Sequence, residues 1–254
     1  MASSDSAGVP WAGRELKPNP FAGDSGQPEV ALLAALEACS QASELNPQRH
    51  VDVIEALRES RLFVPIVASL DEAATDASGL THDKSAEMAM VTLAAEDGRA
   101  TAPGFTGIEQ LIGWNPEARP IPVESLRLML SAVDEGAQLV VIDPGAPHMF
   151  LVRRPAVWSL AQGRQWIPAW ANRRVADEIA RLAAADSVIT ATELRPGSAR
   201  PSAGGAEVGI VVDVPAGTDD AALKTALDRF RRKLAASSLI TELVDSLIVS
   251  VRTV

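Results

Sequence analysis

The sequence predicts an α+β protein built of two α/β-sandwich-like domains, with mostly antiparallel sheets and helices packed on them. Three observations favour this class. Short β-branched apolar runs alternate with amphipathic helical patterns, an Asp-Gly pair at 97–98 separates two such runs as a hairpin turn, and a length of 254 residues favours two domains over one. We expect a flexible leader over residues 1–28, an N-terminal domain over 29–170 and a small C-terminal domain over 171–254.

Composition and charge exclude several classes of protein. With 47% apolar and 22% charged residues, the chain is neither disordered nor fibrous. Its formal net charge is −10, and residues 1–170 carry all of it, with 22 acidic and 12 basic residues against 11 and 11 in 171–254. An acidic surface repels phosphate backbones, so nucleic acid is disfavoured as a partner. A protein partner or a small ligand stays open, as does the oligomeric state.

The single cysteine and the distribution of apolar residues indicate in which cellular compartment the protein is expected. Cys39 alone allows no intramolecular disulfide or thiolate metal site, and its helical apolar surroundings favour a buried thiol. Residues 1–19 lack the apolar core of a signal peptide, and no run approaches the roughly 20 apolar residues that span a bilayer. We therefore expect a cytoplasmic protein without a membrane partner.

The first part of the chain predicts helices from residue 30 and from residue 47, and strands at 62–67, 88–95 and 99–105. Asn46 should cap the second helix, with Pro47 at its first position. Pro65 cannot donate a ladder hydrogen bond, so its strand is expected at an edge or a bulge. Asp97 and Gly98 form the hairpin turn, and the polar residues between the first two strands form a surface loop.

The next segment predicts a short capped helix. In the sequence from Thr106 to Glu109, the Thr hydroxyl should accept from the third helical amide while the Glu carboxylate reaches back to the cap. Trp114 ends this helix, and the prolines that follow keep the chain extended until Pro122 opens the next helix, which stops at Gly136.

The remainder predicts a hairpin, a helix and the small second domain. The hairpin pairs 138–143 with 148–153, and a helix from 154 closes at Gly163. In the second domain, we expect helices to cover one face of an antiparallel sheet. Thr218 should cap its long helix, with acidic residues at the positive end of the helix dipole and basic residues near the negative end.

No motif for catalysis or cofactor binding rises above background. Gly204-Gly205 and Gly209 precede a strand, whereas a nucleotide loop joins a strand to a helix. His82-Asp83 is the dipeptide of some metal-dependent phosphohydrolases, but only His50 and His148 remain as further histidine ligands. A serine triad would need a placed base, and no serine is marked by its sequence context as a nucleophile. We predict no catalytic residue, no metal and no cofactor.

Two groups of side chains can be interpreted either as structural or as binding residues. The basic residues from Arg229 to Lys233 either compensate a helix dipole or bind phosphate or an acidic partner. Four tryptophans lie beside prolines and helix ends, where they either pin loops onto a core or form a binding surface. They are Trp114, Trp158, Trp166 and Trp170.

The hairpin and the helix that follow each other around Gly98 resemble the SseB family in its actinobacterial form. That pattern is an Asp-Gly hairpin, a Pro-x-Phe-Thr step, a short helix, a Trp, a Pro-rich link and, after a helix, an Asp-Pro turn. The matching residues are Lys84, Asp97, Gly98, Pro103, Phe105, Thr106, Trp114, Pro120, Asp143 and Pro144. The resemblance covers roughly residues 30–170 and implies no assigned catalytic activity; the second domain is similar to the family only in layout.

We predict a cytoplasmic, non-enzymatic protein-interaction or regulatory protein, because capped elements and several tryptophans occur without a catalytic constellation. The alternative is a sensor of a small molecule, such as an amino acid or nucleotide, or an enzyme with an unrecognised site. Its groove would be bounded by Lys84, Phe105, Trp114 and Asp143. The candidate ligand- or partner-binding residues are Lys84, Phe105, Thr106, Trp114, Asp143 and Trp166.

Overall fold

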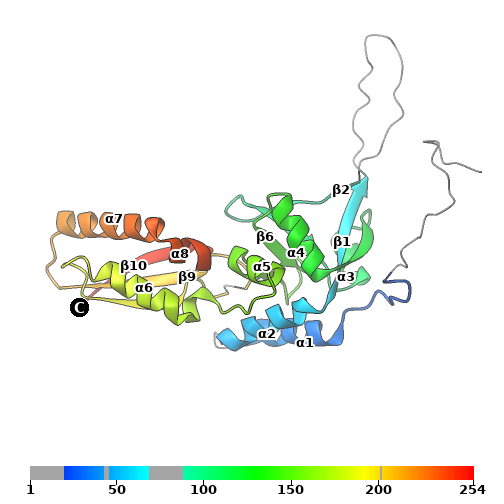
Figure 1. Ribbon diagram of the computed structural model, residues 1–254, viewed down its shortest axis with the longest axis horizontal. Helices are drawn as coiled ribbons and strands as arrows, with labels where there is room; N and C mark the ends of the chain where they lie inside the picture. Colours follow the sequence, from blue (N-terminus) through cyan, green and yellow to red (C-terminus); the bar gives the residue numbers. More distant parts are fainter. Residues whose placement is uncertain (1–19, 43–45, 69–87, 201) are drawn as a thin grey trace, which may run out of the picture.

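The computed structural model describes residues 20–42, 46–68, 88–200 and 202–254. Within these residues the protein is elongated, and two units lie side by side along its length (Figure 1). The N-terminal unit contains α1 (Val30–Ser40), α2 (Pro47–Arg58), β1 (Arg61–Ala68), β2 (Met88–Met90), β3 (Leu93–Ala94), β4 (Ala100–Gly104), α3 (Ile108–Trp114), β5 (Arg119–Glu124), α4 (Ser125–Asp134), β6 (Leu139–Ile142), β7 (Phe150–Val152) and α5 (Arg154–Ala161).

The C-terminal unit is smaller and has one sheet. Its elements are the 3-10 helix η1 (Ala169–Ala171), α6 (Arg173–Ala183), β8 (Ala191–Pro196), β9 (Val208–Val214), α7 (Asp220–Ala236), α8 (Ser238–Leu243) and β10 (Leu247–Thr253). The helices α6, α7 and α8 lie beside the strands in Figure 1. Helices packed on mostly antiparallel sheets make this an α+β fold, as the sequence predicts.

The N-terminal unit has two sheets. One has the strand order β2-β1-β5 and is antiparallel throughout. The other has the order β3-β4-β6-β7, in which β4 and β6 run parallel while the two outer pairs are antiparallel. A bridge between Phe63 of β1 and Phe105, just after β4, joins the two sheets.

Only one face of the β3-β4-β6-β7 sheet packs on helices. Five side chains of this covered face pack against α1, α2, α4 and α5 in the main hydrophobic core. These five are Ala102, Val140, Ile142, Phe150 and Val152. Because strand side chains alternate between faces, their neighbours in the strands point the other way, onto a face that no described helix covers.

The sheet of the C-terminal unit also has one covered face. Alternate residues of β9 (Val208, Ile210, Val212 and Val214) pack against all three helices in a second core, which includes Val175 of α6, Phe230 of α7 and Ile240 of α8. The strand order is β10-β9-β8, and β9 and β10 are parallel. The antiparallel sheet expected here is therefore wrong for this pair, because α7 and α8 form the crossover that returns the chain in the same direction.

The two cores are separate: the first extends to Trp166 and the second begins at Ala169. The domain division expected between 170 and 171 remains a prediction; Ala169 and Trp170 pack in the second core. Among the described residues, no helix is both long and apolar enough to cross a membrane.

The strand pattern departs from the sequence prediction around two prolines. Residues Arg119–Glu124 form β5, and α4 starts at Ser125, so Pro122 does not open a helix. Pro65 lies in the central strand β1, opposite Pro120 of β5, and not at a sheet edge. On the side of β1 away from β5, Phe63 forms backbone hydrogen bonds with Phe105, and pairing with β2 begins only at Ile66. Pro65 lies between these two partners.

Turn and cap chemistry explains most of the boundaries. Gly98 has a φ of +80° in the hairpin turn, and Asn46 accepts from the Gln48 amide at 2.9 Å as the predicted cap of α2. The predicted strand 88–95 divides into β2 and β3, which belong to different sheets. The cap of α7 is Asp219 and not Thr218, because its carboxylate accepts from two amides at the start of the helix.

Candidate functional site

The carboxyl ends of the parallel strands β4 and β6 bring together two residues predicted from sequence, Thr106 and Asp143. The Asp143 carboxylate accepts from the Thr106 amide at 2.8 Å and from the Thr106 hydroxyl at 2.7 Å. The Nε2 atom of His148 lies 3.0 Å from the same carboxylate. Asp143 has a φ of +46°, an uncommon conformation that Asp tolerates better than most residues.

This cluster holds a loop in place. The Thr106 amide and hydroxyl both donate to the Asp143 carboxylate, which ties the chain after β4 to the loop after β6. Thr106 and Asp143 are buried, and the Thr106 carbonyl also accepts from Arg61 at 2.8 Å. The capping box predicted at Thr106 is wrong: Gly107 is the cap residue of α3, and the hydroxyl is bonded to Asp143.

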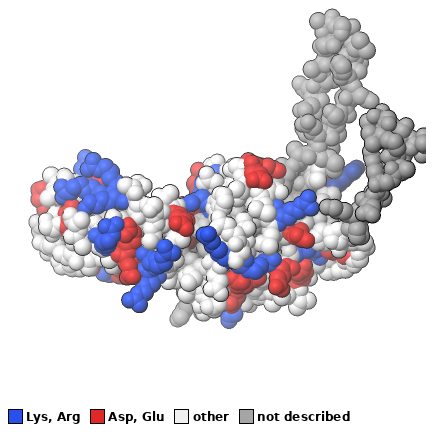
Figure 2. Space-filling model, in the orientation of Figure 1, with Lys and Arg blue, Asp and Glu red and all other residues white. Residues whose placement is uncertain are grey.

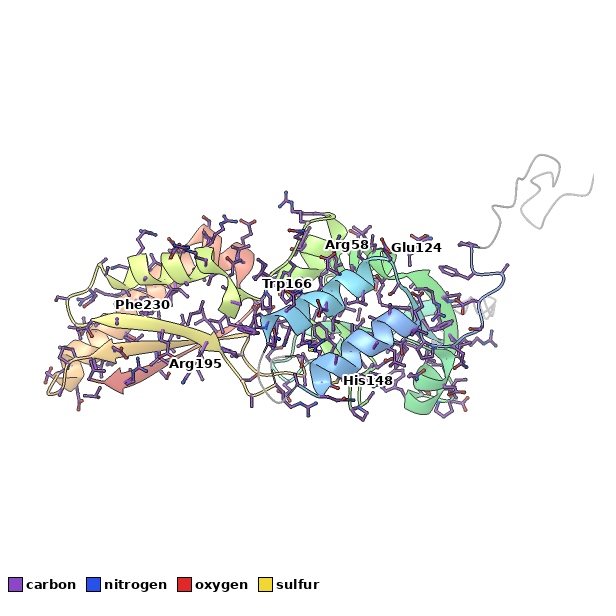
Figure 3. The ribbon with its side chains drawn as sticks, turned by 90° about the horizontal axis from the view of Figure 1, so that it is seen from below. Arg58, Glu124, His148, Trp166, Arg195 and Phe230 are labelled. Carbon is purple, nitrogen blue, oxygen red and sulfur yellow. The ribbon has the colours of Figure 1, made fainter. Side chains whose placement is uncertain are left out.

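The other predicted residues divide between core and junction. The rings of Phe105 and Trp114 lie 5.3 Å apart, and both pack in a small core with Phe63, so they are packing residues in this structure. Trp166 lies at the junction of the two units (Figure 3), beside a cavity of about 10 Å³ that it shares with His50. Lys84 lies outside the described residues.

A larger hollow opens on the helix-free face of the β3-β4-β6-β7 sheet. The strand register places Leu93, Thr101 and Leu139 in one row across the sheet, and Val141 opposite Leu151 in the next. These five side chains line a pocket of about 520 Å³. Leu139 is 0% exposed, yet it belongs to none of the hydrophobic clusters of the described residues. The sheet therefore presents an apolar floor to an open volume.

The C-terminal unit supplies the opposite wall of this hollow. Residues 203–206, which precede β9, line it together with Ser246, which precedes β10. The loop after Asp143 adds Pro144 and Met149, so the Thr106 and Asp143 contacts fix one border of the same volume. We call this volume, between the helix-free sheet face and residues 203–206, the interface pocket.

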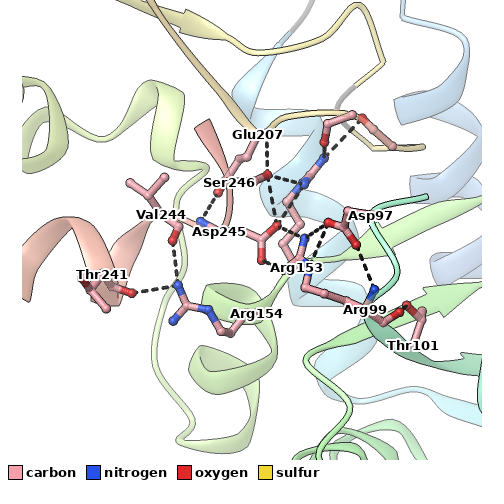
Figure 4. A network of polar contacts seen from close by, with 12 residues as sticks. Asp97, Arg99, Thr101, Arg153, Arg154, Glu207, Thr241, Val244, Asp245 and Ser246 are labelled. Carbon is pink, nitrogen blue, oxygen red and sulfur yellow. Dashed lines mark hydrogen bonds and ion pairs between the residues drawn. The ribbon is translucent and has the colours of Figure 1, made fainter. Parts of the chain in front are cut away.

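A network of arginines and carboxylates forms the polar end of the interface pocket (Figure 4). Arg99 donates through both terminal nitrogens to the Asp245 carboxylate, at 2.7 and 2.9 Å, and through Nε to Asp97 at 2.8 Å. Arg153 donates to Asp245 at 3.1 Å and to the Gly205 carbonyl at 3.0 Å. Both arginines come from the N-terminal unit, so the network ties the two units together.

The charges of this network are fixed near neutral pH. Burial raises the pKa of Asp245, but hydrogen bonds and charges from Arg99 and Arg153 outweigh it and leave the pKa below its usual value. The hydrogen bond from Arg99 likewise lowers the pKa of Asp97, and the bond to Asp245 raises the pKa of Arg99. The pKa of the buried Glu207 is raised, because the effect of burial is larger than the opposite effect of two backbone amides that donate to its carboxylate.

The family of the chain follows from comparison with protein-family models. The model of the SseB protein N-terminal domain matches residues 32–159, which is half of the chain. The chain belongs to the SseB family. No curated protein and no solved structure matches it. The matched SseB domain includes the sheet floor of the interface pocket, Arg99 and Arg153, whereas residues 203–206 and Asp245 lie outside the match.

Sequence reasoning missed the interface pocket, although one signal for it was present. The run of β6 is apolar at every position, so it offers apolar side chains to both faces of its sheet. The helices of the SseB domain cover only one of them. Asp245 gave no signal, because its partners Arg99 and Arg153 lie 146 and 92 residues away in the sequence.

The described residues offer little for metal or thiol chemistry. No group of three or more His, Cys, Asp or Glu side chains among them is placed to hold a metal ion. Burial raises the pKa of the Cys39 thiol to about 11, so this thiol stays protonated at neutral pH. It packs with Leu32 and Leu36 of the same helix in the main core.

The basic cluster on α7 is largely engaged in local contacts. Figure 2 shows Lys and Arg side chains gathered over this helix. Arg229 pairs with Asp186 at 2.7 Å, Arg231 lies 3.6 Å from Asp228, and the Arg232 Nε donates to a carbonyl of its own helix at 3.2 Å. These contacts support helix stabilisation, one of the two interpretations of the cluster.

Proposed function

We propose that this SseB family protein is a non-enzymatic regulatory protein that binds a small apolar molecule carrying a negative charge in the interface pocket. The observation that carries the proposal is the apolar helix-free sheet face, which closes against the C-terminal unit around about 520 Å³. Small-molecule sites commonly enclose about 300–1,000 Å³ with a few polar groups at one end. Because both units line this volume, an occupant contacts both and favours their closed arrangement.

The polar end of the pocket supports a negatively charged group on the ligand. Arg99 shares its guanidinium between Asp245, whose side chain is fully buried, and Asp97, whose side chain is 50% exposed. A ligand carboxylate can replace Asp97 beside Arg99 with little loss, because exposed ion pairs contribute little to stability. Asp245 would remain in place and keep Arg99 oriented.

Two ionisable groups at the polar end of the pocket, Asp97 and Arg99, support binding without catalysis. General acid–base catalysis needs a group that exchanges a proton near the working pH. Asp97 has a lowered pKa and Arg99 a raised one, so neither changes charge near neutrality. Ser246, the lining hydroxyl of the C-terminal unit, bonds Arg153, Asp245 and the Glu207 amide.

Thermal unfolding with a matched panel of ligands tests the proposal. The panel is straight-chain carboxylates from hexanoate to dodecanoate, with amines of the same lengths as controls. A carboxylate at 100 times its Kd should stabilise the protein by about 2.7 kcal/mol, or about 5–10 °C in Tm. The amines should give no shift, since they place a second cation beside Arg99.

A variant with a filled pocket completes the test. Leu151→Trp should abolish the shift, whereas Ser250→Trp, on the sheet of the C-terminal unit, should keep it. Equal shifts with amines, or an unchanged shift in Leu151→Trp, would count against the proposal. The cytoplasmic location expected from the sequence remains part of this proposal, and fractionation of cells tests it.

A further inference from the structure

A second hollow lies at the junction of the two units and shares no lining residue with the interface pocket. It is bordered by α5, by the segment 162–167 and by the start of α6, with Glu242 and Leu243 of α8 on its far side. Its volume is about 710 Å³. We call it the Trp158 groove, after the aromatic side chain that lines it.

The Trp158 groove exposes two large apolar side chains. Trp158 is 44% exposed and Ile167 is 52% exposed, although both lie beside a well-packed core residue, Trp166. Tryptophan is among the residues that contribute most to binding when a partner covers it. Isolated exposed apolar residues are ordinary, but here two of them line one concave surface.

The charge of the Trp158 groove is opposite to that of the protein. Four arginines line it (Arg154, Arg164, Arg173 and Arg174) against one acid, Glu242, on a chain whose net charge is −10. Two of them are available for a partner: the guanidinium groups of Arg164 and Arg174 make no hydrogen bond or ion pair with another described residue.

The other two arginines are partly engaged. Arg173 lies 3.7 Å from Asp177, with the two side chains 93% and 72% exposed, so this pair is weak. Arg154 donates to the carbonyls of Thr241 and Val244, both at 2.7 Å, and thereby fixes the floor of the groove between the units. By contrast, Arg99 near the interface pocket and Arg229 on α7 each pair with a carboxylate.

We propose that the Trp158 groove docks a short acidic segment of a partner protein, whose carboxylates pair with Arg164 and Arg174 and whose apolar side chain packs on Trp158 and Ile167. Unpaired cations beside exposed apolar side chains match a segment that alternates acidic and apolar residues. A nucleic acid would also meet the arginines, but the net charge of the protein is −10, which disfavours the approach of a long polyanionic backbone.

Fluorescence anisotropy with defined peptides tests this docking site. The probe is a labelled peptide with three repeats of Glu-Glu-Leu-Glu, and the controls replace every Glu by Lys or every Leu by Ser. We expect the probe to bind, to weaken as salt is raised, and to bind more tightly than either control. Arg164→Glu/Arg174→Glu should weaken binding by about tenfold or more.

Matched variants separate a docking role from a general effect of charge. Lys224→Glu/Arg232→Glu makes the same change of charge on α7 and should bind the probe like the unaltered protein. Trp158→Ala should weaken binding about tenfold, with Trp158→Phe recovering most of it. All variants are on the surface, and their unfolding temperatures should stay close to that of the unaltered protein.

Three results would overturn the proposal: binding of the lysine peptide as tight as that of the probe, equal weakening by the α7 variant, or displacement of the probe by single-stranded oligothymidine at equal charge concentration. The last result would assign the groove to nucleic acid. Leu151→Trp should leave probe binding unchanged, so failure of this proposal is distinguishable from failure of ligand binding in the interface pocket.

Discussion

The helix-free sheet faces of the two units differ in the kind of side chain that they carry. In the C-terminal unit, the helix-free face carries Arg252, which bonds Asp213 at 2.7 and 3.0 Å and Glu193 at 2.8 Å across all three strands. In the N-terminal unit, the corresponding face carries Leu93, Leu139, Val141 and Leu151 around an open volume. The C-terminal face is stabilised by its own ion pairs, whereas the N-terminal face leaves apolar side chains beside an open volume.

This difference shows where binding is expected. Cross-strand ion pairs satisfy a sheet surface without a partner, since water and opposite charges solvate it. An apolar floor around an open volume lacks van der Waals partners, so an occupant that fills it gains contacts that water does not provide. The comparison therefore favours the N-terminal sheet as the place of the proposed ligand site.

Placing a new carboxylate on each face should have the largest effect. Leu139→Asp buries an unpaired carboxylate and removes apolar contacts, and we expect a loss of about 4 kcal/mol in the free energy of unfolding. Ile248→Asp, at a position of the other face that is 54% exposed, should cost about 1 kcal/mol or less. Urea denaturation of both variants measures the contrast, and equal losses would refute it.

Neutralising one carboxylate beside each face should have the next largest effect. Asp245→Asn leaves Arg99 and the buried Arg153 without their shared anion, and we expect a loss of about 3 kcal/mol. Asp213→Asn removes a partner from the half-exposed Arg252 and should have a smaller effect that fades in about 1 M salt, where the Debye length is about 3 Å. If salt removes the Asp245 effect as well, that carboxylate is not shielded as described.

The covered face of the N-terminal sheet should make stability depend on pH through His50. This ring lies 5.7 Å from both Phe150 and Trp170, and burial, with the charge of Arg153, lowers its pKa from 6.5 to about 4. The unfolded chain therefore binds a proton more readily. The stability due to neutral His50 is complete above pH 6.5 and is lost as the pH falls towards 4, by about 3 kcal/mol.

The control for this dependence is His50→Leu, which keeps an apolar side chain and removes the titration. Unfolding by urea at several pH values should give a shallower dependence for the variant than for the unaltered protein between pH 6.5 and 4. Carboxylates contribute equally to both proteins. Parallel curves would mean that the buried ring does not titrate as its surroundings imply.

The smallest effect is expected at the border of the interface pocket. Thr106→Val removes the hydroxyl that donates to the buried Asp143 carboxylate and should cost about 1 kcal/mol. Hydrogen exchange of the amides of Gly145, Ala146, His148 and Met149 should become faster, because this loop loses one of its anchors. Thr225→Val, whose hydroxyl bonds its own exposed helix, is the control, and comparable exchange in both variants would contradict the anchoring role.

Local chemistry in the sequence predicted much of the fold. The Asp97 and Gly98 turn, the Asn46 cap and the apolar run of β6 each depend on neighbouring residues, and the structure confirms them. Two of the errors share one cause, which is that a distant partner outweighs a local preference. Thr106 caps no helix because Asp143 takes its hydroxyl, and the prolines of β5 are accommodated because β1 presents Pro65 opposite Pro120.

The candidate site was predicted only in part for the same reason. Phe105, Thr106, Trp114 and Asp143 do lie in one neighbourhood, because the parallel pairing of β4 and β6 brings Asp143 beside Thr106. Which face of β6 stays uncovered depends on where the helices pack. Successive residues of a strand point to opposite faces, and an all-apolar strand does not indicate which face the helices cover. Arg99 and Asp245 meet only when the two units come together.

The Arg99 to Asp245 contact has a thermodynamic consequence. If an occupant of the interface pocket strengthens this contact by some factor, the contact must strengthen the binding of that occupant by the same factor, because coupling free energies are reciprocal. A measured change in ligand affinity on Asp245→Asn would therefore equal the change that the ligand makes in the stability cost of the same substitution. One side-chain substitution thus measures how strongly this contact and the interface pocket are coupled.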